Sequence, residues 1–253
     1  PMTDVQRTPT AIDKIADAWV DTSAELSPGL ATYIGRFEYN NKLDDYSPAG
    51  AERAYEATKD ALAALEAATP VDAVDVVTKA DLAGDLRLSV ELHEAGNHLR
   101  DLNVIASPAQ DIRSGFDLMP TATVDDWGVI SERLSVVPGA IDGYIQTLRQ
   151  GIATGTVPAR RQVSEVITQI ARYTADNGFF ATFAAEASPE EGALPASLAR
   201  DLSDNANAAR VAYDELSVFL RDELAGAASE TDGVGRDLYS LHSRRFLGAT
   251  IDL

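Results

Sequence analysis

The sequence predicts an all-α protein, a multi-helix, antiparallel, bundle-like array with short loops. Apolar residues recur at spacings of three and four along most of the 253-residue chain. Serine, threonine and proline stand where several of these apolar stretches begin, as they do at helix N-termini. No pair of alternating apolar runs flanks an Asn-Gly or Asp-Gly turn, so we expect no β-hairpin.

The first predicted helix begins after Thr10. Thr10 and Asp13 have the three-residue spacing of a capping box, and the residues that follow place an apolar face on one side. Ser27-Pro28-Gly29 is expected to end this helix. Residues 30–46 are expected to form a loop with one short turn.

Two prolines mark the limits of the next helices. Ser47-Pro48 opens a helix that we expect to end at about Ala68. Thr69-Pro70 separates it from a helical stretch that runs to about Arg100, with a break near Lys79.

The second half repeats these start signals after an irregular segment with one short turn near residues 110–114. Separate helices are expected on the two sides of Pro138, because proline breaks a helix interior. The clearest helix begins at Pro195, since its apolar residues are spaced by three or four throughout. The expected helices cover about 123–136, 138 to between 151 and 155, 158–175, 179–185, 195–225 and 236–247.

The length and composition are those of a globular protein with a substantial core. Apolar residues make up 45% of the chain and charged residues 24%. Pro1 ahead of Met2 resembles an expression-tag remnant, so residues 1–9 are interpreted as a remnant and flexible N-terminus. Residues 10–253 are predicted to form a single all-helical domain.

The charge balance and the composition restrict the classes of binding partner and the cellular compartment that we expect. The net charge is −19, which repels both the phosphates of nucleic acids and anionic membrane surfaces. No apolar window is long enough to cross a membrane, and there is no signal-peptide core. There is also no cysteine, so nothing requires an oxidising compartment. We therefore expect no nucleic-acid or membrane partner and a cytoplasmic location.

One string is close to a zinc-peptidase motif but departs from it. His93-Glu94 and His98 are similar to the His-Glu-x-x-His signature with one residue too many. Five residues place the two histidines about 140° apart around a regular helix, so they cannot bind the same zinc ion. A rescue by a helix break at Gly96 is conceivable, but the sequence gives no sign of one.

Other catalytic patterns are also missing. No Glu-x-x-His pair, no Gly-x-Ser-x-Gly elbow and no glycine-rich phosphate loop is present. The sequence therefore predicts no catalytic residue and no metal ligand in this chain.

Two segments place arginines where a partner is expected. Arg113 and Asp117 lie in the irregular segment, where an internal ion pair and a functional group are both compatible with the pattern. Arg160 and Arg161 lie in the first turn of a predicted helix, against the helix dipole. Such a position favours a carboxylate partner, either within the chain or on a ligand.

A third segment, residues 235–248, concentrates basic and aromatic side chains in an acidic chain. Tyr239 and His242 are three residues apart and share one helix face, and Arg244 follows. The pattern indicates either a helix packed on an acidic neighbour or a surface that contacts a ligand.

These segments carry a family resemblance that extends over essentially the whole chain. The chain resembles the bacterial domain-of-unknown-function 885 family, most clearly in Ile-Arg-Ser-Gly-Phe-Asp-Leu-Met-Pro, residues 112–120. Further matching segments are 26–35, 43–48, 132–138, 155–163 and 235–248.

The resemblance implies a mostly helical fold, like the N-terminal half of a helical, zincin-like peptidase. Zinc is then expected only in a C-terminal half, which contains a His-Glu pair and a Pro-Gly-His-His element. This chain would be the truncated, non-catalytic N-terminal half, inactive alone, and would form one wall of the substrate channel. The residues expected to face a peptide substrate are Arg113, Arg160, Arg161, Tyr239, His242 and Arg244.

Two partners follow from this interpretation: the C-terminal half of the same protein and a peptide substrate. An isolated half could also dimerise through an exposed apolar face. The alternative function is a self-contained helical scaffold or peptide-binding module without catalysis.

Overall fold

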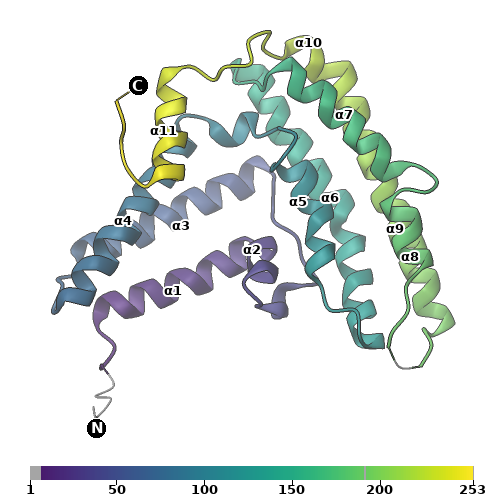
Figure 1. The fold of residues 1–253 in the computed structure, drawn as a ribbon, viewed down its shortest axis with the longest axis horizontal. Coiled ribbons are helices and arrows are strands. Elements are labelled where there is room, and N and C mark those ends of the chain that lie inside the picture. The colour runs from purple at the N-terminus through teal and green to yellow at the C-terminus, as the bar shows by residue number, and fades with distance from the viewer. Residues whose placement is uncertain (1–6, 191, 253) are drawn as a thin grey trace. The chain divides into compact units, whose positions relative to one another are not determined.

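A computed structural model describes residues 7–190 and 192–252 (Figure 1). Within these residues the chain is helical and holds no strand, apart from an isolated bridge between Ala159 and Ser229. The predicted all-α class is therefore confirmed. The helices are α1 (Ala11–Leu26), α2 (Pro28–Tyr33), α3 (Pro48–Ala67), α4 (Ala73–Glu94), α5 (Pro108–Ser114), α6 (Val124–Thr154), α7 (Arg160–Thr174), α8 (Phe179–Ala185), α9 (Ala196–Phe219), α10 (Ala225–Ala227) and α11 (Arg236–Leu247).

The described residues divide into two compact units. Unit 1 comprises residues 7–23, 53–95 and 235–252, and unit 2 comprises residues 24–52, 96–190 and 192–234. The prediction of a single domain over residues 10–253 stays a prediction. Residues 1–6 of the expected tag remnant lie outside the described residues, whereas Arg7 forms ion pairs with Asp13, Asp72 and Asp75.

Unit 1 is built from two small apolar clusters. Ile12 of α1, Leu65 of α3 and Leu86 of α4 are fully buried against one another. The capping box at the start of α1 forms as predicted, because Asp13 N donates to Thr10 Oγ1 and Thr10 N donates to Asp13 Oδ2. A second cluster joins α4 to α11.

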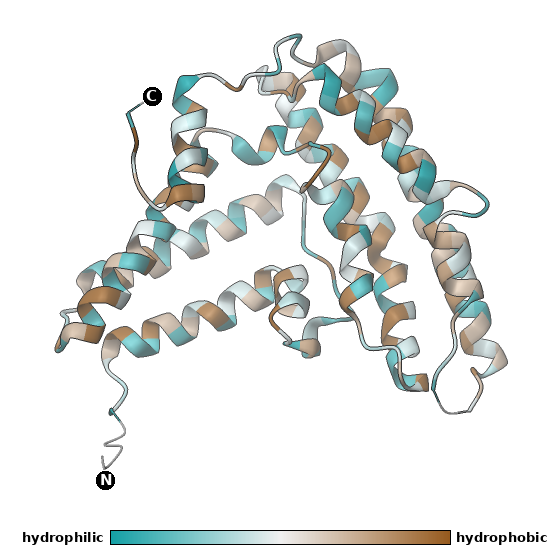
Figure 2. Ribbon diagram, in the orientation of Figure 1, coloured by the Kyte–Doolittle hydropathy of each residue, from teal (hydrophilic) through white to brown (hydrophobic). Residues whose placement is uncertain are grey.

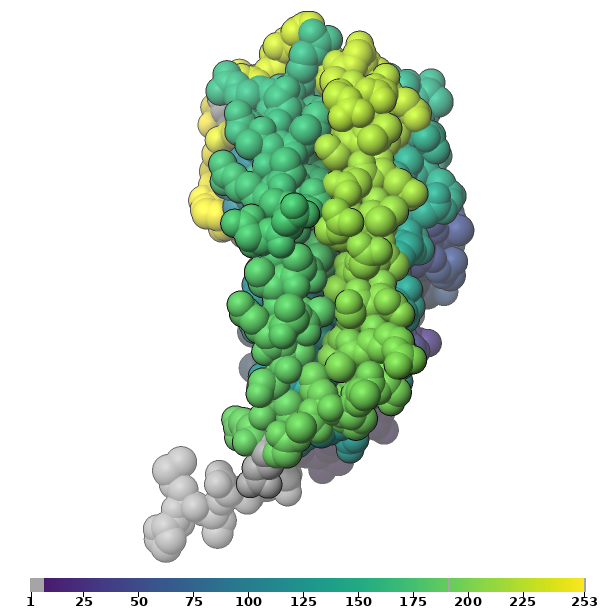
Figure 3. Space-filling model, turned by 90° about the vertical axis from the view of Figure 1, so that its right-hand side faces the viewer, coloured from purple at the N-terminus to yellow at the C-terminus, as the bar shows by residue number. Residues whose placement is uncertain are grey.

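Unit 2 has the larger core, centred on the contact between α6 and α9. Figure 3 shows α9 running lengthwise beside α7 and α8 on one face of the molecule. Tyr144 and Tyr213 are fully buried in this core, and each phenol donates to a backbone carbonyl, of Asp101 and Ala109 respectively. Burial raises the pKa of both phenols well above the ordinary value, so they remain protonated donors.

The predicted separation of helices at Pro138 is wrong, because α6 continues through it. Pro138 is only partly buried and lies at the edge of the apolar face, whose residues remain in the core without interruption, at Ile130, Leu134, Val137 and Ile141. The proline removes one backbone donor, but the apolar face on both sides packs on one core. Tertiary packing therefore outweighs the local breaking signal.

The helical stretch before Arg100 also differs from the prediction. No break occurs near Lys79, and α4 instead ends at Glu94, followed by Gly96 in the left-handed region at φ 70°. A 3₁₀ turn, Asn97–Arg100, follows. Glycine accepts a positive φ without strain and commonly ends helices in this way.

The segment predicted as a loop contains more structure than expected. Besides α2, residues 30–46 include a 3₁₀ turn, Phe37–Tyr39. In the later segment that was predicted to be irregular, a second 3₁₀ turn, Gly115–Leu118, follows α5. The long helix predicted from Pro195 forms as α9, a π-helical turn at Leu220–Leu224 and α10. The wider π turn fits the sequence, where Leu216, Leu220 and Leu224 recur every fourth residue and all remain buried.

A buried arginine, Arg133 of α6, fixes the early segment of unit 2. Its side chain is 0% exposed. Its Nε donates to Lys42 O at 2.8 Å, and its Nη2 donates to Thr32 Oγ1 at 2.8 Å and to Pro28 O at 3.2 Å. The neighbouring Asp44 accepts from Ser27 Oγ at 2.6 Å and from Gly29 N at 2.8 Å. The segment is thus held by polar contacts as well as by its apolar residues.

Two glycines of α6 give a matched test of backbone packing. A Cβ on Gly151 would lie 2.4 Å from Leu99 O and 2.5 Å from Thr156 O, whereas Gly139 has no atom within 4 Å of that position. We predict that Gly151→Ala destabilises unit 2 by about 2 kcal/mol or more. Gly139→Ala should be neutral or stabilising by up to about 1 kcal/mol.

The measurement is urea unfolding followed by Trp127 fluorescence in a Trp19→Phe background, since each unit contains one of the two tryptophans. Equal effects of the two glycine substitutions would contradict the packing described for the end of α6.

Candidate functional site

The last helix, α11, is positioned on α4 by one apolar and one ionic contact. Leu238 of α11 packs on Leu88 and Leu92 of α4. Arg244 donates to both carboxylate oxygens of Glu91, at 2.5 and 3.0 Å. A bidentate pair of this kind fixes orientation as well as position. The predicted docking of this helix on an acidic neighbour is therefore found.

One face of α11 remains uncovered within unit 1. Tyr239, His242 and Phe246 follow each other at spacings of three and four, and the Phe246 side chain is 91% exposed. A groove of about 520 Å³ lies along this face, and the chain after α11 returns beside it with Ile251 in its lining. Figure 2 shows the apolar C-terminal end of α11.

A second groove, of about 550 Å³, lies between α4 and the end of α11. Asp81, Gly84 and Asp85 line it from α4, and Arg244 and Arg245 line it from α11. Arg245 also lines the first groove. The two grooves therefore share Arg245 as a lining residue.

Arg113 lies in unit 2 and already has partners there. It forms an ion pair with Asp117, and its guanidinium lies 4.1 Å from the centre of the Phe179 ring. The cation–π contact and the ion pair together fix a partly buried side chain. The internal ion pair, one of the two interpretations of this segment, is therefore present.

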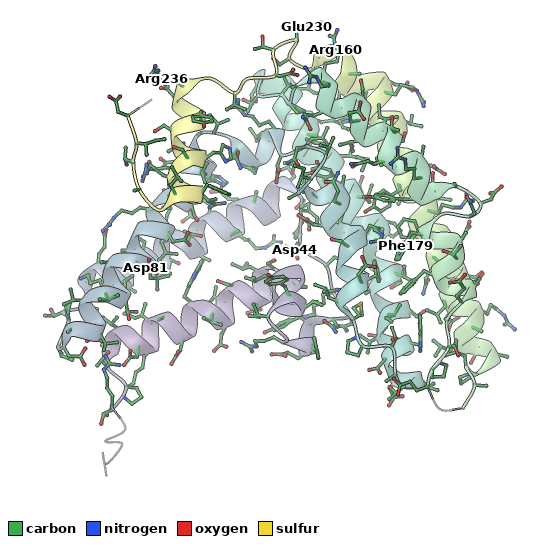
Figure 4. The ribbon with its side chains drawn as sticks, in the orientation of Figure 1. Asp44, Asp81, Arg160, Phe179, Glu230 and Arg236 are labelled. Carbon is green, nitrogen blue, oxygen red and sulfur yellow. The ribbon has the colours of Figure 1, made fainter. Side chains whose placement is uncertain are left out.

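Arg160 and Arg161 also have carboxylate partners within unit 2. Arg160 pairs with Glu230 and donates to Ala225 O at 3.0 Å, and Arg161 pairs with Asp232. Figure 4 shows Arg160 and Glu230 side by side at the start of α7. The carboxylates expected from the position of these arginines thus come from the segment after α10.

The six side chains expected to face a substrate therefore fall into separate groups. Tyr239, His242 and Arg244 share α11 in unit 1, whereas Arg160 and Arg161 share the start of α7 and Arg113 lies on α5, in unit 2. Their role toward a substrate stays a prediction.

Within the described part of the chain, the histidines and carboxylates are not arranged as a zinc site. The regular helix assumed for His93 and His98 does end between them, at Gly96. His93 nevertheless stacks on Tyr55, with ring centres 4.2 Å apart. Among residues 7–190 and 192–252 no three His, Asp or Glu side chains are grouped as metal ligands.

The sequence prediction missed Arg245, Phe246 and the two aspartates on α4. Phe246 lies four residues after His242, so the helical spacing already placed it on the same face. The contribution of Asp81 and Asp85 could not be found in this way, because it depends on the contact between α4 and α11, which are far apart in sequence.

The Glu91–Arg244 pair predicts a pH dependence of α11 docking. Arg244 holds the pKa of Glu91 below its ordinary value of 4.5. A lowered folded-state pKa contributes stability above the unfolded value, and this contribution is lost as the pH falls through the lowered pKa. Both partners are partly exposed, so the contribution is about 0.2–1 kcal/mol.

We expect amide hydrogens of α11 to exchange more slowly in the wild type than in Glu91→Gln at neutral pH, and this difference should vanish once the pH falls below the lowered pKa of Glu91. Glu66→Gln is the control, because the ion pair of Glu66 with Arg87 joins α3 to α4 rather than α4 to α11. A difference that persists at the acid end would contradict the ionic docking of this helix.

The comparisons with known proteins agree with the predicted resemblance. Within the described residues, no helix combines the length and apolar character needed to cross a membrane. No curated protein matches the chain. One family, described as "Bacterial protein of unknown function (DUF885)", matches residues 28–253. This match covers most of the sequence, and the chain therefore belongs to the DUF885 family.

Proposed function

We propose that this chain is a non-catalytic helical part of a bacterial zinc-dependent peptidase and that it forms one wall of the substrate channel. The observation that carries the proposal is the uncovered face of α11, where Tyr239, His242 and Phe246 border a groove of about 520 Å³. Grooves with apolar walls and a few polar groups are typical binding sites for small ligands and short peptides. The implied zinc-peptidase relationship of the family supports a peptide as the ligand.

The proposal assigns the metal and the reacting groups to a C-terminal half of the same protein. Among the described residues no three His, Asp or Glu side chains are grouped as metal ligands, and on this proposal the contribution of this chain is to bind and orient the substrate. A partner half would also cover apolar side chains that are exposed in unit 1 outside this groove, including Val74, Val76 and Val77. We further propose a cytoplasmic location, since the chain has no cysteine that needs an oxidising compartment.

A helical scaffold or peptide-binding module without catalysis is the second candidate function. The ion pairs of Arg113, Arg160, Arg161 and Arg244 favour it, because each arginine already has a carboxylate in its own unit. These arginines would then stabilise the fold rather than bind a substrate. On this proposal the uncovered face of α11 binds a peptide without cleaving it, or forms a dimer.

The test is steady-state hydrolysis of a peptide library by the full-length product of the source gene, supplied with zinc. Tyr239→Ala and Phe246→Ala should raise KM about tenfold and leave kcat nearly unchanged, because these side chains bind the substrate without reacting. Tyr33→Ala is the matched control, since Tyr33 is an aromatic residue of unit 2 that is 74% exposed.

The peptidase proposal fails if the zinc-supplied gene product hydrolyses no peptide. The channel-wall assignment fails if hydrolysis occurs and the two α11 variants behave like Tyr33→Ala.

A further inference from the structure

Arg245 lies where the two grooves of unit 1 meet. The first groove is mostly apolar and is lined by Tyr239, Phe246, Leu247 and Ile251, among others. The second is polar and has Asp81 and Asp85 on its α4 side. A ligand that occupied both grooves would therefore contact Arg245.

The charge of Arg245 is not compensated by a carboxylate, whereas the charge of the neighbouring Arg244 is. Arg244 forms a bidentate pair with Glu91, whereas the hydrogen bond of Arg245 goes to the neutral Ser89 Oγ, at 3.1 Å. Among the described residues, no carboxylate lies within ion-pair distance of Arg245. A guanidinium has five N–H donors in a planar fork, so most of its donors remain available for a carboxylate.

The first groove accepts an apolar side chain. Phe246 is 91% exposed and Leu247 and Ile251 are also exposed, and the three side chains line the same hollow. An apolar group that covered this surface would remove apolar area from water. This burial would stabilise the complex by about 25 cal/mol for each Å² buried.

The second groove favours a positive charge. Asp81 and Asp85 are four residues apart on α4, so their carboxylates lie on one face and repel each other. Gly84 lies beside them, and a Cβ on it would meet no atom within 4 Å, which leaves the floor of the groove open. A cation placed there would relieve the repulsion.

We propose that the two grooves together bind a short zwitterionic peptide with an apolar C-terminal residue. The C-terminal carboxylate binds Arg245, the last side chain lies in the apolar groove, and the N-terminal ammonium lies toward Asp81 and Asp85. The inference rests on the proposed function, because it names the ligand class of the α11 face. It uses only residues of unit 1.

The probe is the tripeptide Ala-Ala-Phe, titrated into the purified chain by calorimetry. We expect saturable binding with a Kd on the order of 0.1–1 mM. The C-terminal amide of the same peptide should bind at least about tenfold more weakly, because it lacks the carboxylate. Ala-Ala-Ser should also bind more weakly, because it does not fill the apolar groove.

Variants locate the site on α11 and α4. Arg245→Gln should weaken Ala-Ala-Phe about tenfold and should remove the difference between the acid and the amide. The paired substitution Asp81→Asn with Asp85→Asn should abolish the difference between the free and the N-acetylated peptide. Arg87→Gln is the matched control, because Arg87 is an exposed arginine of α4 that lies outside both grooves and pairs with Glu66.

Equal binding of the acid and the amide, an Arg245→Gln variant that binds like Arg87→Gln, or no saturable binding would each overturn the inference. These failures are distinguishable from failure of the proposed function. Peptide hydrolysis that depends on Tyr239 and Phe246 can persist without recognition of a C-terminal carboxylate by Arg245, and the two grooves can bind Ala-Ala-Phe in a protein that hydrolyses nothing.

Discussion

The arrangement of unit 2 depends on the burial of one charge, the guanidinium of Arg133. Burial lowers its pKa to about 10, while the nearby Asp44 opposes this shift, so the group remains charged at neutral pH. A buried charge without partners would be very unfavourable, and here backbone carbonyls and the Thr32 hydroxyl supply them. Because those acceptors belong to α2 and to the segment before α3, the charge fixes both to α6. The apolar core of α6 and α9 then packs beside a segment whose conformation is already determined.

The sequence predicts helices well where apolar spacing and end signals agree. α8 and α11 have the predicted bounds, and α1 begins at the capping box of Thr10 and Asp13. The errors arise where long-range packing overrides a local signal, as at Pro138, where the apolar face of α6 continues on both sides. Arg133 itself could have been noticed, because it lies three residues after Ile130 on an otherwise apolar face. Its partners could not, since they lie about a hundred residues away in sequence.

The candidate site was predictable only as far as one helix extends. The spacing of Tyr239 and His242 identified one face of α11, and the same spacing includes Phe246. The two grooves depend on the contact of α11 with α4 and on the return of the chain after Leu247, which no local pattern indicates. The other candidate arginines, unlike Arg245, form ion pairs within their own unit. The reason is electrostatic, because in a chain of net charge −19 most exposed guanidinium groups lie near a carboxylate. Arg245 differs because its hydrogen-bond partner is a serine.

The most direct measurement of this account is the stability of an Arg133→Met variant, which keeps most of the side-chain volume and removes the charge and its donors. In a Trp19→Phe background, urea unfolding should show a loss of at least about 3 kcal/mol, because several buried acceptors lose their donor at once. Hydrogen exchange of the Gly29 amide, which donates to Asp44, should accelerate in the same variant. Arg221→Met, at an exposed arginine of unit 2, is the control and should change neither property. An Arg133→Met protein as stable as this control, with the Gly29 amide still protected, would contradict the dependence of unit 2 on the buried charge.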